Sequence, residues 1–171
     1  TLFSLDLDSL APQAAAPHSP ANATAITDHD SPQFTVAYIG ACTGAKLDDL
    51  RAAAGMLRGR TVASGTRLLV APASRADQAQ AADEGVMAIL ESAGATILAT
   101  ACGMCAGYGP NRLAADDVCI SSTARNFRGR MGAPGSRVWL ASPASVAAAA
   151  VTGRLTDPRE MDPHGTPRNT I

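Results

Sequence analysis

The sequence has almost no net charge, few histidines and no long apolar run. Its 171 residues contain 14 Lys and Arg against 15 Asp and Glu, so no basic excess is available to neutralise nucleic-acid phosphates. The apolar runs are broken well before the roughly 20 residues that a membrane-spanning helix needs, and the start of the chain lacks the cationic flank of a signal peptide. We therefore expect a soluble, cytoplasmic protein that binds neither nucleic acid nor membrane.

Residues 34–155 have the pattern of one folded domain. Short apolar runs predict strands, and stretches of helical periodicity lie between them. The strands are expected at 35–39, 67–71, 96–99, 118–121 and 137–140, and the helices at 47–57, 76–82, 86–92 and 144–151. This alternation predicts an α/β fold, a three-layer α/β/α sandwich with a mostly parallel sheet.

The two ends of the chain have a different composition. Residues 1–33 are rich in Pro, Ala, Ser and Asp and show no sustained helical period, so we expect an extended arm or linker that contacts a partner. Residues 156–171, with three prolines, are expected to form an extended tail.

Three of the four cysteines lie in glycine-containing loops that follow predicted strands. Cys42 follows the first strand, in Ile-Gly-Ala-Cys-Thr-Gly, and Cys102 and Cys105 follow the third, in Ala-Cys-Gly-Met-Cys-Ala-Gly. Ligand sites of parallel sheets gather at the carboxyl ends of the strands, so these thiols are expected to meet at one edge. Cys119 lies inside a predicted strand and is expected to be a buried free thiol.

Four interpretations of the cysteines compete. A structural zinc site needs four ligands, and His18, His29 and His164 all lie in the arm and the tail. A thioredoxin-like dithiol would leave Cys42 without a role. Buried free thiols suit Cys119 but not the loops. The fourth interpretation is a 4Fe-4S cluster held by three thiolates, whose open iron acts as a Lewis acid on a hydroxyl or carboxylate.

Three segments carry a family resemblance. They are Ile-Gly-Ala-Cys-Thr-Gly at 39–44 with Asp-Asp-Leu-Arg at 48–51, Ala-Cys-Gly-Met-Cys at 101–105, and Ala-Arg-Asn-Phe-Arg-Gly-Arg at 124–130. Together they resemble the signature segments of the aconitase superfamily, most closely the third, C-terminal domain of the 3-isopropylmalate dehydratase large subunit. Residues 5–13 and 142–153 are similar to segments that flank this domain in the family.

The resemblance implies an iron–sulfur hydro-lyase that acts on a 2-hydroxy di- or tricarboxylic acid or a related specialised metabolite. In that family, the cysteines that match Cys42, Cys102 and Cys105 hold the 4Fe-4S cluster. The arginines that match Arg125 and Arg130 pair with substrate carboxylates. Such charge-assisted, bidentate bonds contribute about 1.5–3 kcal/mol each.

The chain departs from the family pattern at polar positions close to the signature residues. The family usually has Ser where this chain has Ala41, Asn-Ser-Arg where it has Gly44, Ala45 and Lys46, and Asn where it has Ala124. These changes remove hydrogen-bonding groups around the cluster and the substrate, so they point to a specialised relative.

No acid–base residue for the reaction is assigned in this chain. Asp48 and Asp49 fit the start of a helix, where negative charge is favourable, and Asp116 and Asp117 fit a turn. The family's other domains supply most of the acid–base groups and a catalytic Ser. We therefore expect an enzyme that is active only with separate subunits supplying those domains. The competing hypothesis is a non-catalytic iron–sulfur binding or sensing protein derived from this domain.

Overall fold

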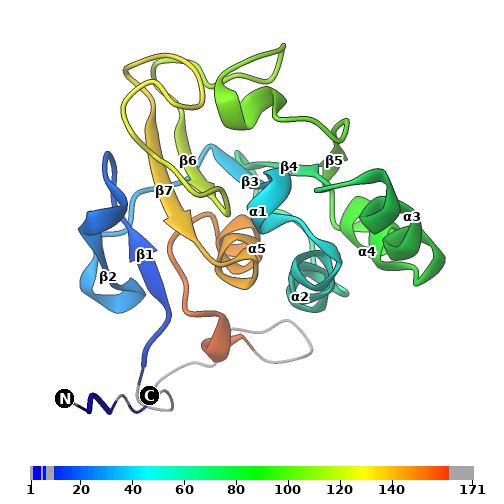
Figure 1. Cartoon of the computed structure of the whole chain (residues 1–171), viewed down its shortest axis with the longest axis horizontal. Helices are drawn as coiled ribbons and strands as arrows, with labels where there is room; N and C mark the ends of the chain where they lie inside the picture. The colour runs from blue at the N-terminus through cyan, green and yellow to red at the C-terminus, as the bar shows by residue number, and fades with distance from the viewer. Residues whose placement is uncertain (1, 5, 7–9, 162–171) are drawn as a thin grey trace.

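Seven strands form one mixed sheet in the computed structural model, which describes residues 2–4, 6 and 10–161 (Figure 1). The strand order is β2-β1-β7-β6-β3-β4-β5, in which β3 to β7 pair in parallel and β1 pairs antiparallel with β2 and β7. The strands are β1 (Gln13–Ala15), β2 (Ala23–Ala25), β3 (Val36–Gly40), β4 (Arg67–Ala71), β5 (Thr96–Ile97), β6 (Val118–Ser121) and β7 (Arg137–Ala141). Residues 162–171 of the predicted tail, including His164, lie outside the residues that the structure describes.

The helices lie close to where the sequence predicts them. They are α1 (Ala41–Gly44), α2 (Leu47–Leu57), α3 (Arg75–Asp83), α4 (Val86–Ser92) and α5 (Pro143–Thr152), with short 3-10 turns at η1 (Pro20–Asn22), η2 (Ile26–Asp28), η3 (Gly103–Ala106) and η4 (Pro158–Glu160). The side chain of Ser142 caps α5, and Gly153 ends it with a φ of 75°. The α/β class and the mostly parallel sheet are confirmed.

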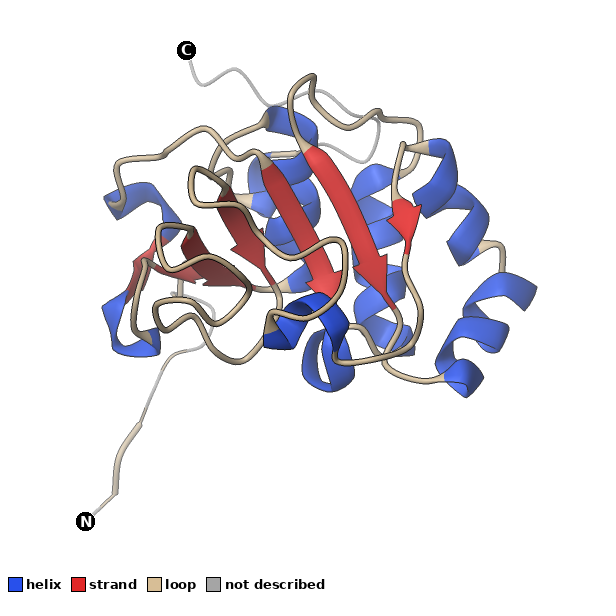
Figure 2. Ribbon diagram, turned by 90° about the horizontal axis from the view of Figure 1, so that it is seen from above, coloured by secondary structure: helices blue, strands red, loops and turns tan. Residues whose placement is uncertain are grey.

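The two faces of the sheet are covered differently (Figures 1 and 2). On one face, Ile39 of β3 packs in a core that includes Leu50 of α2 and Val146 of α5. On the other face, Tyr38 and its neighbours are covered by η3 and by the long connections 98–117 and 122–136. Met104 of η3 is buried in this second core. The loop that carries Cys102 and Cys105, here called the cysteine loop, is therefore part of the layer that covers the second face.

The strand order reverses at β3. From β3 the chain passes to β4 and β5 on one side, and it then returns to β6 and β7 on the other side. Such a switch point leaves a crevice at the carboxyl ends of the two central strands, where ligands bind. Cys42 follows β3 directly, and the segment 124–130 follows β6. The topology therefore brings the first cysteine and the two arginines to the same crevice.

Part of the predicted arm belongs to the domain. Ala14 of β1 pairs with Ala141 of β7 and is 1% exposed, and Ile26 is buried in the main core. The ring of His29 packs edge-on against Trp139, with 4.8 Å between their centroids. The physical reason is that β7 would otherwise present an unpaired edge, which β1 covers by a long-range pairing that local periodicity does not reveal.

Candidate functional site

The turn after β3 presents Cys42 to solvent. Cys42 is exposed in the single turn α1, whereas the preceding Ala41 is buried. Ala41 has a φ of 67°, in the left-handed region that residues with a side chain rarely adopt. Such a conformation costs about 1–3 kcal/mol and is found most often at functional sites.

Ser122 joins this turn to the loop after β6. Its Oγ accepts a hydrogen bond from the Gly40 N–H at 3.0 Å and donates one to the Gly44 carbonyl at 2.8 Å. A Cβ on Gly44 would lie 2.1 Å from the carbonyl oxygen of Ser122, so only glycine fits here. The glycine and the close approach of Ser122 therefore depend on each other.

The second cysteine loop winds through η3. Cys102 is exposed at the start of η3, and Cys105 is 7% exposed within it. The turn ends at Gly107, whose φ of 76° favours glycine. A Cβ on Gly107 would lie 3.2 Å from the carbonyl oxygen of Arg130. The cysteine loop and the arginine segment are therefore packed against each other.

Arg130 lies beside one of the three thiols. Its Nη2 is 3.8 Å from Cys105 Sγ, and its guanidinium is 5.6 Å from the centroid of the Phe127 ring. Its Nε is buried and has no hydrogen-bond partner among the described residues. The positive charge stabilises negative charge on the neighbouring sulfur. Arg125, in contrast, is exposed to solvent.

Asn126 anchors the arginine segment, a role that the sequence analysis did not assign. Its side chain is fully buried, and its Nδ2 donates to the carbonyls of Ala16 at 2.9 Å and Val138 at 3.1 Å. These bonds tie the segment between the two arginines to β7 and to the N-terminal residues. An amide inside a charged segment is the sequence signal that could have indicated this anchor.

Tyr38 is the second residue that the sequence analysis missed. Its side chain is fully buried, and its hydroxyl has no hydrogen-bond partner among the described residues. Burial, and to a lesser extent the nearby thiols of Cys105, Cys119 and Cys102, raises the pKa of Tyr38 far above its ordinary value, so the hydroxyl stays protonated. Tyr38 also lines a cavity of about 240 Å³ below the cysteine loop.

Cys119 is a buried free thiol, as its position in a strand predicts. Burial raises the pKa of this thiol well above its usual range. Its Sγ donates to the carbonyl of Ile120 at 3.5 Å. Cys119 is therefore a neutral core residue in this structure.

The carboxylates near the cysteine loops have structural roles. Asp49 accepts a hydrogen bond from the Lys46 N–H at the start of α2, and Asp48 pairs with Arg51. Asp117 accepts from the Ala114 N–H in the turn before β6. Within residues 10–161 and the few described before them, no three Asp, Glu, His or Cys side chains surround a single metal position. Thiolates of a cluster each bind a different iron, so a cluster does not need that arrangement.

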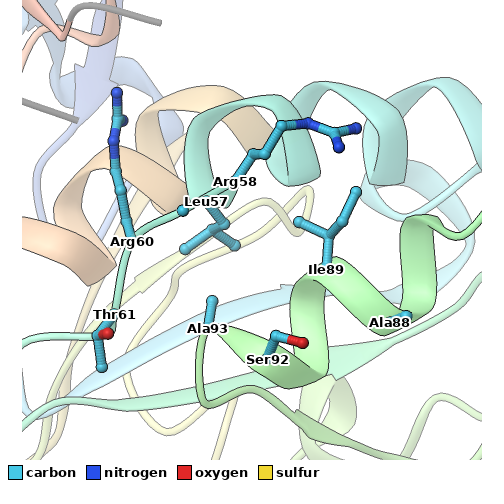
Figure 3. A pocket seen from close by; sticks show the side chains of 9 residues that line it. Leu57, Arg58, Arg60, Thr61, Ala88, Ile89, Ser92 and Ala93 are labelled. Carbon is cyan, nitrogen blue, oxygen red and sulfur yellow. The ribbon is translucent and has the colours of Figure 1, made fainter. Parts of the chain in front are cut away.

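A hollow of about 380 Å³ lies between the ends of α2 and α4, away from the cysteines. Arg58 and Arg60 lie at its rim, and Figure 3 shows their guanidinium groups directed apart. Arg60 Nη1 donates to the carbonyl of Met56 at 2.7 Å. The two cations therefore do not form a joint anion site, and the crevice at β3 and β6 is the better candidate.

Comparison with known proteins gives a consistent result. The model of the aconitase family (aconitate hydratase) matches residues 28–153. The chain is 44% identical over 157 residues to a protein named 3-isopropylmalate dehydratase large subunit 2 from Archaeoglobus fulgidus, covering 92% of this chain and 38% of that protein. It is also 44% identical over 158 residues to the homoaconitase large subunit of Thermus thermophilus, with 92% and 38% covered.

A 3-isopropylmalate dehydratase large subunit from Herpetosiphon aurantiacus is 44% identical over 156 residues, covering 91% of this chain and 37% of that protein. The chain thus spans less than two fifths of the length of these relatives. In the described residues, no helix is both long and apolar enough to cross a membrane.

Proposed function

The chain belongs to the aconitase family, and on this premise we propose that it is the cluster-carrying subunit of a hydro-lyase acting on a 2-hydroxy di- or tricarboxylic acid. Two observations support the proposal: Ser122 joins the Cys42 turn at the switch point to the loop after β6, and Arg130 of that loop has its Nη2 3.8 Å from Cys105 Sγ. A bound 4Fe-4S cluster would supply an iron that acts as a Lewis acid on the substrate hydroxyl.

The donor set suits such a cluster. Cys42, Cys102 and Cys105 are free thiols on two turns, while Cys119 is enclosed in the core. The glycines of both turns let the backbone approach a bulky group closely. Arg130 adds a positive charge next to Cys105, which offsets the negative charge of thiolate ligands. Cys42, Cys102 and Cys105 are the proposed ligands.

The arginines are proposed to bind the substrate. Arg125 is exposed to solvent, and Asn126 fixes the backbone beside it. Arg130 is partly exposed and its Nη2 lies 3.8 Å from Cys105 Sγ, so its guanidinium is next to a proposed cluster ligand. A guanidinium binds a carboxylate through two parallel hydrogen bonds, which orients the substrate as well as holding it.

The proposed subunit acts with separate partner chains. Elimination of water needs a base that removes a proton and an acid that assists the leaving hydroxide. The aspartates near the crevice are engaged in a helix start and a turn, and His29 bonds to Thr24 and to the Ala14 carbonyl. Acid–base groups are therefore expected from chains that supply the remaining aconitase-like domains, in a cytoplasmic complex.

The ligand assignment can be tested by anaerobic reconstitution of the chain with ferrous iron and sulfide. Serine variants of Cys42, Cys102 and Cys105 are expected to lose most of the bound iron and the brown cluster absorbance. Cys119→Ala, the matched control, should keep both. Loss of the cluster in Cys119→Ala together with its retention in Cys42→Ser would refute the assignment.

A further inference from the structure

The Tyr38 side chain runs along β3 toward the carboxyl end of the strand. A Cβ on Gly40 would lie 2.2 Å from Tyr38 Cζ and 2.5 Å from its Oη, so the ring lies directly over Gly40. Gly40 has an extended backbone, with a φ of −171°, and any residue could adopt that conformation. The glycine is therefore required by the phenol ring and not by the backbone. Because Gly40 has no side chain, the Tyr38 hydroxyl can lie beside Gly40, two residues before Cys42.

The Tyr38 hydroxyl beside Gly40 has no hydrogen-bond acceptor among the described residues. Tyr38 is fully buried, and its Oη has no hydrogen-bond partner among the described residues. A buried polar group without a partner costs about 1–3 kcal/mol, so native structures normally satisfy it. The second core around it is apolar, with Val36, Leu69 and Met131 among its members. The residues that the structure describes thus provide a hydrogen-bond donor at this position but no acceptor for it.

Cys105 and Cys119 lie in the same buried cluster as Tyr38, and Cys119 is a neutral thiol enclosed in the core. Cys105 and Cys102 lie on the loop that covers Tyr38, and Cys105 belongs to the same buried cluster. Arg130 already provides one donor to Cys105 Sγ, at 3.8 Å, from the side of the arginine segment. Tyr38 approaches from the side of the sheet.

From this placement we propose that Tyr38 is a hydrogen-bond donor to a sulfur of the iron–sulfur centre, either the Cys105 thiolate or a bound sulfide. The inference rests on the proposed function, because it requires a cluster at these cysteines. A neutral hydroxyl that donates to an anionic sulfur makes a charge-assisted bond. Such a bond stabilises the reduced, more negative cluster and raises its reduction potential. Tyr38 is thus a residue that sets the potential and the retention of the cluster.

The test compares Tyr38→Phe with Tyr108→Phe in the full chain. Tyr108 is exposed and borders the same cavity, so it is the matched control. Each variant is reconstituted anaerobically with ferrous iron and sulfide. The midpoint potential, the rate of iron release to a chelator and the melting temperatures of the cluster-free and loaded forms are measured.

Tyr38→Phe is expected to lower the midpoint potential and to release iron about fivefold faster, the ratio that corresponds to one net hydrogen bond. The cluster-free variant should melt at or above the wild-type temperature, since it loses a hydroxyl that has no partner. Tyr108→Phe should match the wild type throughout. A tyrosine with a purely structural role would not give this combination, in which the substitution weakens the loaded form but leaves the cluster-free form as stable as the wild type or more so.

Four outcomes would overturn the inference. An unchanged potential and release rate in Tyr38→Phe would show that the hydroxyl does not contact the cluster. An equal loss of stability in the cluster-free and loaded forms, or failure of Tyr38→Phe to fold, would assign Tyr38 to core packing alone. If the wild type and Tyr108→Phe do not assemble a cluster either, the proposed function itself fails, and the inference fails with it.

Discussion

Gly44→Ala is predicted to destabilise the protein by breaking the contact between the Cys42 turn and Ser122. The added Cβ would lie 2.1 Å from the Ser122 carbonyl oxygen, whereas ordinary contact begins at 3.4 Å, so the two segments must separate by about 1.3 Å. Overpacking of this kind costs about 1–3 kcal/mol. The separation also weakens the two hydrogen bonds of Ser122 Oγ, each worth about 1 kcal/mol.

The expected loss is about 2–4 kcal/mol in the free energy of unfolding. For a domain of this size, each kcal/mol lowers the melting temperature by about 2–4 °C. Urea denaturation followed by circular dichroism would measure the loss. Anaerobic reconstitution of Gly44→Ala should also show reduced iron uptake, because Cys42 lies on the displaced turn.

Gly55→Ala is the matched control for this change. Gly55 lies within α2, is exposed, and has no atom within 4 Å of the position of an added Cβ. Alanine in a helix interior is favoured over glycine by about 1 kcal/mol, so this variant should be more stable than the wild type. If Gly44→Ala unfolds at the wild-type urea concentration while Gly55→Ala is stabilised, the tight contact at Ser122 does not exist as described.

Three further predictions concern the anchor, the acid response and the substrate. Asn126→Ala should lower the free energy of unfolding by about 2–4 kcal/mol, because the part-buried Ala16 bond and the buried Val138 bond are both lost; unchanged denaturation would argue against the anchor. The pKa of Asp77 is lowered, chiefly by the Ser74 hydroxyl, so the stabilisation by this carboxylate is present above about pH 4 and is lost as the pH falls through the lowered pKa. Asp77→Asn should therefore lower the melting temperature at pH 7, and the difference from the wild type should disappear at pH 2. A constant difference in melting temperature across this range would contradict the prediction. Arg130→Lys should reduce turnover of the assembled complex more than tenfold, because an ammonium group cannot form two parallel bonds; kinetics equal to the wild type would exclude the carboxylate contact.

Local patterns in the sequence predict the central part of the fold. The apolar run of β4 and the periodicity of α2 match the structure at 67–71 and 47–57. β4 is buried on both faces of the sheet, which gives a continuous apolar run, and α2 packs one side against the core, which gives a helical spacing of apolar residues. β1 and β2 could not be predicted in this way, because each has three residues and β1 is defined by a long-range pairing, in which Ala14 lies opposite Ala141, 127 positions later.

The candidate site was likewise predictable from local sequence only in part. Loops after strands were expected to bring the cysteines to one edge. The topology places the Cys42 turn at the switch point, whereas the loop of Cys102 and Cys105 follows the edge strand β5 and packs over the sheet beside Arg130. The spacing of Cys102 and Cys105 does not indicate that one is exposed and the other buried. The roles of Tyr38 and Asn126 depend on a ring lying over Gly40 and on carbonyls contributed by distant segments. Neither can be read from neighbouring residues.

The most direct test of the central claim is dehydratase activity in a reconstituted complex. The chain is loaded with its cluster anaerobically and mixed with chains that carry the remaining aconitase-like domains, and elimination of water from a panel of 2-hydroxy di- and tricarboxylic acids is followed by absorbance of the unsaturated product. We predict turnover of at least one acid by the complex, none by this chain alone, and none after Cys42→Ser. Turnover by the isolated chain would contradict partner dependence, and a complete absence of turnover from an assembled complex with an intact cluster would support a non-catalytic iron–sulfur protein instead.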